Sequence, residues 1–166
     1  MNDTTLPHHP HAEIEAHPEM PAITIVRDFA ASAAQLLRAH LDPEIFVQWC
    51  GPADTRVDID VWDARPLGSY RYSCTGADGV QHWFRGTFPD VRDDRLVQTF
   101  CYEGFPDAVA LETMTFTELG DGRTRIHGLS LYPSREARDG MLASGMDTGV
   151  NDGYAAIDTL LTEGSL

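Results

Sequence analysis

Three side chains in the middle of the sequence have the types and spacing that acid–base chemistry requires. Glu112 alternates with Met114 and Phe116, so a strand there would place its carboxylate among apolar groups. Burial raises a carboxyl pKa, which suits acid–base catalysis or the binding of a cationic ligand. A register shift of one residue would instead leave Glu112 in solvent. Tyr102 offers a phenol, and His82 is either a partner for such a carboxylate or a surface residue at a strand end.

Several other chemistries are excluded by the residues that are missing. The sequence has no G-x-S-x-G elbow, no H-E-x-x-H motif and no glycine-rich phosphate loop after a strand. All 12 basic residues are arginine, so Schiff-base and P-loop lysine chemistry is absent. Cys50, Cys74 and Cys101 are widely spaced and odd in number, which favours reduced core thiols over a disulfide framework or a zinc site. We expect no metal and no cofactor.

Length and charge narrow the class of protein further. The chain has 166 residues, the length of one domain with a real core, and a formal net charge of −14. The acidic excess argues against a nucleic-acid or anionic-membrane partner. No apolar run approaches the roughly 18 residues of a membrane span, and the first residues do not read as a signal peptide. A cytoplasmic location is therefore the expectation.

Residues 1–21 read as a flexible tail that precedes the folded domain of residues 22–163. The tail is rich in proline and histidine and has no hydrophobic periodicity. Its histidines are either solvated or bind metal adventitiously: His8, His9, His11 and His17.

The folded part begins with a β-branched run, Ala22–Ala30, that predicts a strand. Ser32 is a suitable N-cap for a short amphipathic helix, and a second short helix is predicted over Glu44–Trp49. A long helix capped by Ser134 is predicted to run to about Thr162. Between the helices, alternation and turn signals predict six strands in series. They are Arg56–Trp62, Ser69–Cys74, Val80–Phe88, Arg95–Gly104, Ala108–Leu119 and Arg123–Pro133.

This order of elements predicts an α+β fold. Seven antiparallel strands need a cover for one apolar face, and only the last helix is long enough to provide it. A helix of about 28 residues spans about 42 Å, so a curved sheet must wrap around it. Gly145, Gly149 and Gly153 recur on one stripe of that helix, with Met141 one turn earlier. The stripe either lets the helix approach the sheet closely or leaves room for a ligand.

Five segments carry a resemblance to a known family: "DPEIFVQWCGP", "RPLGSYRY", "FRGTFPDVRDDRLVQTF", "TFTELGDGRTRI" and "RDGMLASGMDTGVNDGYAAIDTLL". Together, over about residues 22–163, they resemble the branch of the SRPBCC (START-like, helix-grip) superfamily that contains homologues of the activator of heat-shock protein 90 ATPase. The family usually has a second tryptophan where Cys50 stands, and paired glycines where Leu67-Gly68 stands. The resemblance implies a helix-grip fold with a cavity between the concave sheet and the long helix.

Strand parity selects the side chains expected to face this cavity. Trp49 is either a lid on the cavity or a plug in the core. Trp62 and Trp83 fall on the opposite parity, where they could form a surface patch and a homodimer contact. The expected ligand-binding residues are Trp49, Tyr70, Tyr72, Phe84, Phe88, Gln98, Phe100, Tyr102, Glu112, Met114, Phe116, Met141, Gly145 and Gly149.

The functional expectation is a protein that binds a small, mostly apolar, aromatic or lipid-like molecule. Two alternatives remain open. One is an enzyme of the cyclase or hydratase kind with Glu112, Tyr102 or His82 as acid or base, which requires polar groups that converge in the cavity. The other, implied by the family resemblance, is a cofactor of a chaperone ATPase.

Overall fold

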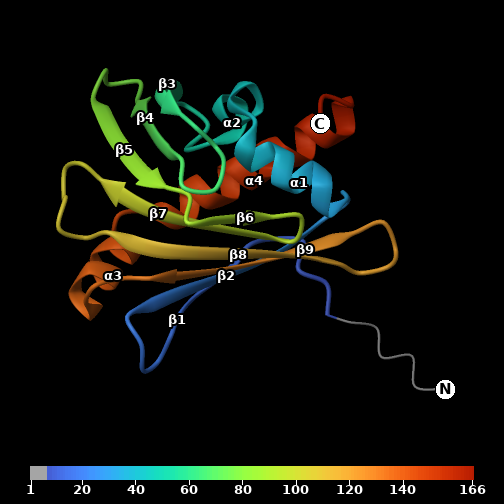
Figure 1. Cartoon of the computed structure of the whole chain (residues 1–166), viewed down its shortest axis with the longest axis horizontal. Helices are drawn as coiled ribbons and strands as arrows, with labels where there is room; N and C mark the ends of the chain where they lie inside the picture. Colours follow the sequence, from blue (N-terminus) through green and yellow to red (C-terminus); the bar gives the residue numbers. More distant parts are fainter. Residues whose placement is uncertain (1–6) are drawn as a thin grey trace.

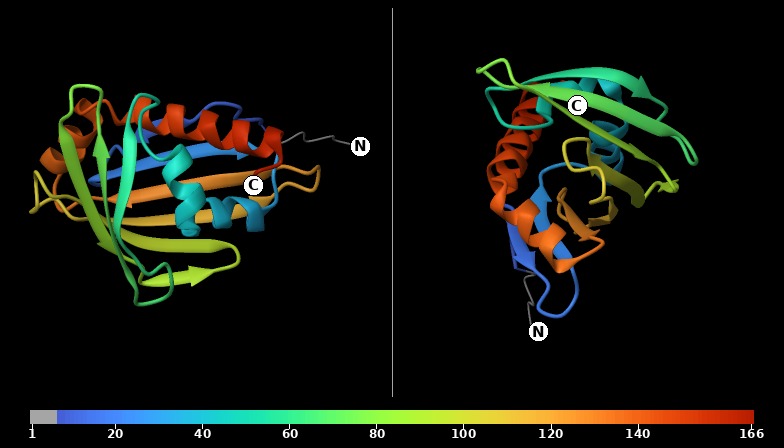
Figure 2. Two further views of the ribbon diagram at one scale, coloured as in Figure 1. Left: turned by 90° about the horizontal axis from the view of Figure 1, so that it is seen from above. Right: turned by 90° about the vertical axis from the view of Figure 1, so that its left-hand side faces the viewer.

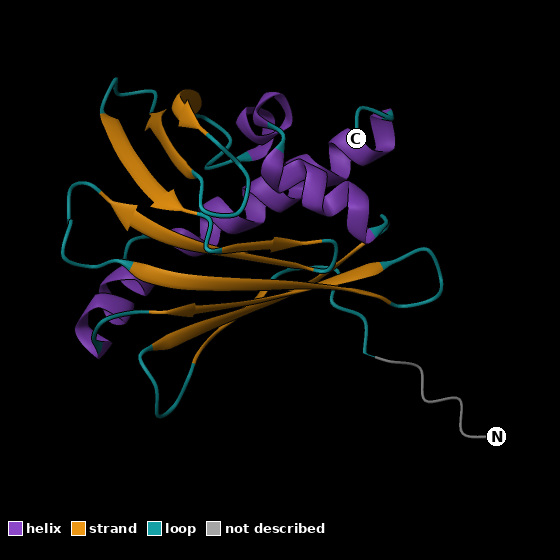
Figure 3. Cartoon of the chain, viewed as in Figure 1, coloured by secondary structure: helices purple, strands orange, loops and turns teal. Residues whose placement is uncertain are grey.

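One antiparallel sheet organises the whole chain. The structure is a computed structural model that describes residues 7–166 (Figures 1 and 3). Three of its helices lie on one side of the sheet, and the helix of residues 135–143 lies at the end of the strands. The strands are β1 (Glu13–Ala16), β2 (Ala22–Phe29), β3 (Arg56–Trp62), β4 (Ser69–Thr75), β5 (Gln81–Thr87), β6 (Asp90–Arg92), β7 (Arg95–Tyr102), β8 (Ala110–Glu118) and β9 (Thr124–Leu131). The helices are α1 (Ala33–Leu41), α2 (Pro43–Trp49), α3 (Arg135–Ala143) and α4 (Met146–Glu163).

The strand order explains how the sheet curves around α4. The order is β1-β2-β9-β8-β7-β5-β4-β3, and the short β6 pairs with β7. The β5–β7 junction has only two pairs in register, Phe84 with Tyr102 and Arg85 with Cys101. The sheet bends at this narrow junction, so β3–β5 rise on one side of α4 while β7–β9 and β2 lie beneath it (Figure 2). The predicted α+β architecture with a wrapped C-terminal helix is confirmed.

All seven predicted strands form, and β1 and β6 bring the total among the described residues to nine. Strand β1 corrects the expectation that residues 1–21 form a flexible tail. Residues 13–16 pair antiparallel with β2, in register from Glu13 with Val26 to Ala16 with Ile23. The sequence "EIEA" is too short for its alternation to be recognised, and its stability comes from pairing with an edge strand. Residues 1–6 lie outside the described part of the chain.

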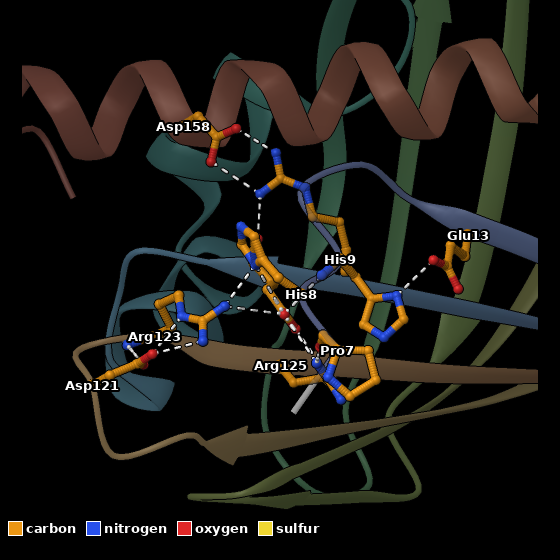
Figure 4. Close-up of polar contacts among 10 residues, drawn as sticks. Pro7, His8, His9, Glu13, Asp121, Arg123, Arg125 and Asp158 are labelled. Atoms are coloured by element: carbon orange, nitrogen blue, oxygen red, sulfur yellow. Dashed lines mark hydrogen bonds and ion pairs between the residues drawn. The ribbon is translucent and has the colours of Figure 1, made fainter. Parts of the chain in front are cut away.

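A buried carboxylate fixes the segment before β1. Asp28 accepts hydrogen bonds from the backbone N–H of His9 at 3.0 Å and from Arg125 Nε at 2.7 Å, and its side chain is fully buried (Figure 4). His9 Nδ1 also pairs with Glu13 Oε1 at 2.7 Å. The N-terminal segment from Pro7 onward is thus attached to β2 and β9.

Local capping explains the two short helices. Ser32 accepts a hydrogen bond from the Gln35 N–H, and the Gln35 side chain accepts one from the Ser32 N–H, forming the capping box of α1. Asp42 then caps α2, whose first residue is Pro43. Among the described residues, no helix is long and apolar enough to cross a membrane.

The long C-terminal helix of the prediction is in fact two helices. α3 ends at Ala143, and Gly145 adopts a left-handed conformation with φ 82° and ψ 23° before α4 begins at Met146. A residue with a Cβ is strained at this φ, so glycine here serves the turn between helices. Helical spacing continues across the break, which is why the sequence pattern read as one helix.

The two remaining glycines of the stripe differ in their surroundings, and we predict opposite effects on stability. A Cβ on Gly153 would lie 2.8 Å from the Trp49 carbonyl oxygen, whereas one on Gly149 would lie 3.7 Å from Pro52 Cδ. We expect Gly153→Ala to lower the free energy of unfolding by about 1–3 kcal/mol through overpacking. Gly149→Ala should raise it by about 0.5–1 kcal/mol through helix propensity. Urea denaturation of both variants tests this, and shifts of equal sign would contradict it.

Trp62 and Trp83 were both expected on the outer surface of the sheet, and for Trp62 this expectation is wrong. A shift of register between Ile59 and Val61 reverses the parity of β3 before Trp62. The Trp62 ring therefore points inward, packs 4.7 Å from the ring of Phe46, and donates a hydrogen bond from Nε1 to the Leu41 carbonyl at 2.8 Å. Trp83 stays on the other face, under the Arg71 guanidinium at 3.8 Å.

Candidate functional site

A small cleft opens between the concave face of the sheet and α4. Its walls come from β2, β7, β8 and β9 on one side and from Tyr154 of α4 on the other. The cavity volume is about 60 Å³. It is lined by Ile25, Leu96, Gln98, Glu112, Thr113, Met114, Gly128, Leu129, Ser130 and Tyr154.

Glu112 gives the cleft one polar end. Its carboxyl accepts hydrogen bonds from Gln98 Nε2 at 2.7 Å and from Ser130 Oγ at 3.3 Å. The register places all three side by side, because Gln98 and Ser130 are the partners of Glu112 on β7 and β9. Burial raises the pKa of Glu112, and the two hydrogen bonds offset only part of that rise. The predicted inward direction of Glu112 is therefore correct, and the solvated alternative is not.

Tyr154 closes the cleft from the helix side. It is buried, and its ring meets the ring of Phe29 edge-on at 5.1 Å. Burial first, and then the nearby carboxylate of Glu112, raise the pKa of the Tyr154 phenol above its ordinary value. The phenol stays protonated and is available as a hydrogen-bond donor.

An aromatic strip continues from the cleft along β7 and β5. Gln98, Phe100 and Tyr102 follow one another on the same face of β7, and all three are half-buried. Phe84 of β5 stacks on Phe100 at 5.5 Å and lies 5.4 Å from Tyr102. Ring surface that is half-buried on the concave face remains available for contact with a ligand.

Other residues predicted to line the cavity instead fill the core. Tyr70, Tyr72, Phe88 and Phe116 are all buried and pack together with α1 and α2. Trp49 acts as a plug: its ring packs on His40 and Phe46, and its Nε1 donates to the Ala39 carbonyl at 2.7 Å. The concave face is thus largely occupied on the β3–β4 side.

The C-terminal residues of the predicted site also lie elsewhere. Met141 packs in a separate cluster with Ile23, Ala110 and Tyr132. Gly145 forms the turn between α3 and α4, and Gly149 faces Pro52. The glycines therefore do not form the cleft.

The three acid–base candidates do not converge. His82 is exposed, and its Nδ1 lies 2.9 Å from the Tyr102 hydroxyl. Glu112 pairs with Gln98, which is four residues from Tyr102 along β7, or about 13 Å in an extended strand. Within residues 7–166, no cluster of three or more His, Cys, Asp and Glu side chains is arranged to hold a metal ion.

Strand parity found Gln98, Glu112 and Met114 but missed the other side of the cleft. Tyr154 shares the helical spacing of Ile157 on the buried face of α4, and that spacing was the available signal. Ser130 alternates with Gly128 on β9, where no acidic or aromatic residue drew attention to it.

The curved antiparallel sheet, the two short helices and the cleft under the last helix define a START-like helix-grip protein. The sequence matches the family described as "Activator of Hsp90 ATPase homolog 1-like protein" over residues 30–162, and the chain belongs to that family. Comparison with curated proteins gave no match.

Solved structures share the fold over nearly the whole chain. Protein Ms6760 from Mycobacterium smegmatis is 27% identical, with a TM-score of 0.82, covering 92% of this chain and 97% of its own. A protein from Rhodobacter sphaeroides is 24% identical with a TM-score of 0.83, covering 92% and 99%. One from Arthrobacter aurescens is 24% identical with a TM-score of 0.82, covering 91% of each chain. The last two likenesses bear on the fold alone.

Proposed function

We propose that this protein binds a small, mostly apolar molecule that carries one hydrogen-bond donor, such as an amine or a hydroxyl. The observation that carries the proposal is the carboxyl of Glu112, oriented by Gln98 and Ser130 at the polar end of an otherwise apolar cleft. A half-buried carboxyl with oxygen lone pairs left over attracts a donor, and most strongly a cationic one.

The apolar part of the ligand has two surfaces to contact. Leu96, Met114 and Ile25 line the cleft next to Glu112. Beyond Gln98, the half-buried rings of Phe100 and Phe84 extend this surface along the sheet. A molecule with its donor at Glu112 and one ring or a short chain on this strip would bury most of its surface.

The volume of the cleft limits the size of what it encloses. Drug-sized ligands occupy pockets of roughly 300–1,000 Å³. A cavity of about 60 Å³ accommodates only the head and a few carbons of a ligand. The rest must lie over the open aromatic strip or displace α4, which contacts this part of the sheet through Tyr154.

The other candidate functions have weaker support. An enzyme with Glu112, Tyr102 and His82 as its acid–base groups lacks their convergence, as described above. The role of chaperone cofactor has only the family's descriptive name behind it. A cytoplasmic location is supported by three free cysteines, which persist in reducing compartments.

We predict that affinity follows the head group of a matched aromatic series. Benzylamine and benzyl alcohol should bind more tightly than benzoate, because an anion is repelled by the Glu112 carboxyl. Isothermal titration or ligand-observed NMR measures the three affinities. Glu112→Gln should weaken benzylamine binding about ten-fold or more while affecting benzyl alcohol less.

Glu118→Gln is the matched control, because Glu118 is exposed at the far end of the same strand. This variant should leave the affinities for benzylamine, benzyl alcohol and benzoate unchanged. Tighter binding of benzoate than of benzylamine, or equal losses for the two glutamate variants, would contradict the role of Glu112.

A further inference from the structure

A second polar pair lies at the end of the aromatic strip that is distant from Glu112. His82 of β5 and Tyr102 of β7 come from neighbouring strands, and the Nδ1 atom of His82 lies 2.9 Å from the Tyr102 hydroxyl. Phe84 follows His82 by two residues and is the partner of Tyr102 in the sheet, so all three side chains share one face. The pair therefore lies on the same side of the sheet as the cleft.

The position of the Tyr102 ring is fixed by its surroundings. A Cβ on Gly104 would lie 2.5 Å from the Tyr102 hydroxyl, so the ring occupies the space that a side chain would need there. The Phe84 ring lies 5.4 Å from the Tyr102 ring, and the His82 ring lies 5.6 Å from it. The half-buried phenol thus contacts a backbone segment, a phenyl ring and an imidazole.

The pair of His82 and Tyr102 always presents a hydrogen-bond donor to a ligand. A neutral imidazole and a phenol together carry one N–H and one O–H. The 2.9 Å contact uses one of these protons, whichever tautomer His82 adopts, and the other stays free. Protonation of His82 would free one more. Within residues 7–166, neither side chain makes a second hydrogen bond, so the free donor is available to an oxygen atom of a ligand.

The strip between the two polar ends is continuous and has a defined length. Gln98, which donates to Glu112, and Tyr102 are four residues apart on β7, or about 13 Å. Phe100 lies between them on the same face, and Phe84 stacks on it at 5.5 Å. An extended chain advances about 1.2 Å for each bond, as a polypeptide backbone does. A chain of about nine bonds, with a hydrogen bond at each end, therefore covers the strip.

We infer that the ligand is a medium-chain amphiphile with a hydrogen-bond donor at one end and a carbonyl or carboxylate oxygen at the other, such as an ω-amino or ω-hydroxy fatty acid. The inference rests on the proposed function, because the donor end is the group assigned to Glu112. It adds that His82 and Tyr102 bind the other end. The separation that argues against joint acid–base catalysis by these residues is the length that such a ligand spans.

The test is isothermal titration of the whole chain with octylamine and with ω-aminooctanoate, two eight-carbon probes that differ only at the end distant from the amine. We expect ω-aminooctanoate to bind about ten-fold more tightly, a gain that one hydrogen bond to a charged oxygen provides. ω-Aminobutanoate carries the same two groups but is too short to reach Tyr102. It should bind no more tightly than butylamine.

Variants of the pair locate the source of this preference. His82→Phe and Tyr102→Phe each leave one donor, so each should keep part of it. The double variant has neither donor and should bind the two eight-carbon probes equally, while its affinity for octylamine stays that of the unmodified chain. His127→Phe is the matched control and should keep the full preference, because His127 is exposed on the opposite face of β9 from Ser130. Circular dichroism confirms that each variant is folded.

The outcomes separate this inference from the proposed function. Equal affinities of the unmodified chain for octylamine and ω-aminooctanoate would overturn the inference, and octylamine binding that Glu112→Gln weakens would still support the proposed function. A preference for ω-aminooctanoate that survives in the folded double variant would also overturn the inference. Failure of both probes to bind would overturn the inference and the proposed function together. The comparison of probes on the unmodified chain decides the inference even if the double variant unfolds.

Discussion

Asp28→Asn is expected to lower the free energy of unfolding by about 3–5 kcal/mol, the range seen when one partner of a buried ion pair is removed. The Asp28 side chain is fully buried. Arg125 donates hydrogen bonds to both of its oxygens, from Nε to Oδ1 at 2.7 Å and from Nη2 to Oδ2 at 3.0 Å. The asparagine amide cannot replace the second acceptor, so the Arg125 guanidinium, whose side chain is 19% exposed, would lose its counter-charge. Denaturation in urea at pH 7 measures the loss.

This effect should extend to the N-terminal segment, because Asp28 also accepts a hydrogen bond from the backbone of His9 (Figure 4). Amide hydrogen exchange in β1 should therefore accelerate in Asp28→Asn. Asp121→Asn is the matched control: Asp121 pairs with Arg123 at the protein surface and is 49% exposed. It should change stability far less. Equal losses in the two variants would contradict the importance of the buried carboxylate.

The pKa of Asp28 agrees with this account. Burial alone would raise it, but the hydrogen bonds from Arg125 and the His9 backbone lower it overall. A carboxyl with a lowered pKa stabilises the fold above its unfolded-state pKa, and this stabilisation is lost as the pH falls through the folded-state value.

His40 should make the protein lose about 3 kcal/mol of stability between pH 7 and pH 4. It is buried, its Nδ1 lies 2.7 Å from the Leu36 carbonyl, and burial lowers the pKa of its imidazole from 6.5 to about 4. In the unfolded chain, His40 therefore becomes protonated below about pH 6.5. In the folded chain it becomes protonated only near pH 4. Stability falls across that window, by about 1.4 kcal/mol for each pH unit.

The pH dependence, rather than the absolute stability, tests this prediction. His40→Asn keeps a donor for the Leu36 carbonyl but cannot titrate, so its free energy of unfolding should fall less between pH 7 and pH 4. His82→Asn, at an exposed histidine, is the control and should keep the wild-type slope. A wild-type slope in His40→Asn would contradict the assignment of the transition to His40.

The sequence predicted the elements of this fold better than their junctions. The alternation of seven strands and the Ser32 cap are local patterns, and each formed as expected. The bulge that turns Trp62 inward and the break at Gly145 are single-residue events that leave the surrounding periodicity intact. Strand β1 depends on its pairing with β2, which four residues do not reveal.

In the candidate site, too, the sequence predicted the local pattern but not the features that depend on how the elements pack. Parity along β7 and β8 correctly placed Gln98 and Glu112 on the concave face. How much of that face stays open depends on where α2 and α4 pack, which periodicity does not specify. Tyr72 and Phe116 therefore became core, whereas Phe100 remained half-buried.

The most direct test of a ligand in this cleft is an amide NMR titration of the whole chain with benzylamine. The account predicts saturable shifts around Leu96–Tyr102, Glu112–Met114, Gly128–Ser130 and Tyr154, the segments that form the cleft and the aromatic strip. Shifts that appear only elsewhere, or a spectrum that does not change at saturating probe, would contradict it.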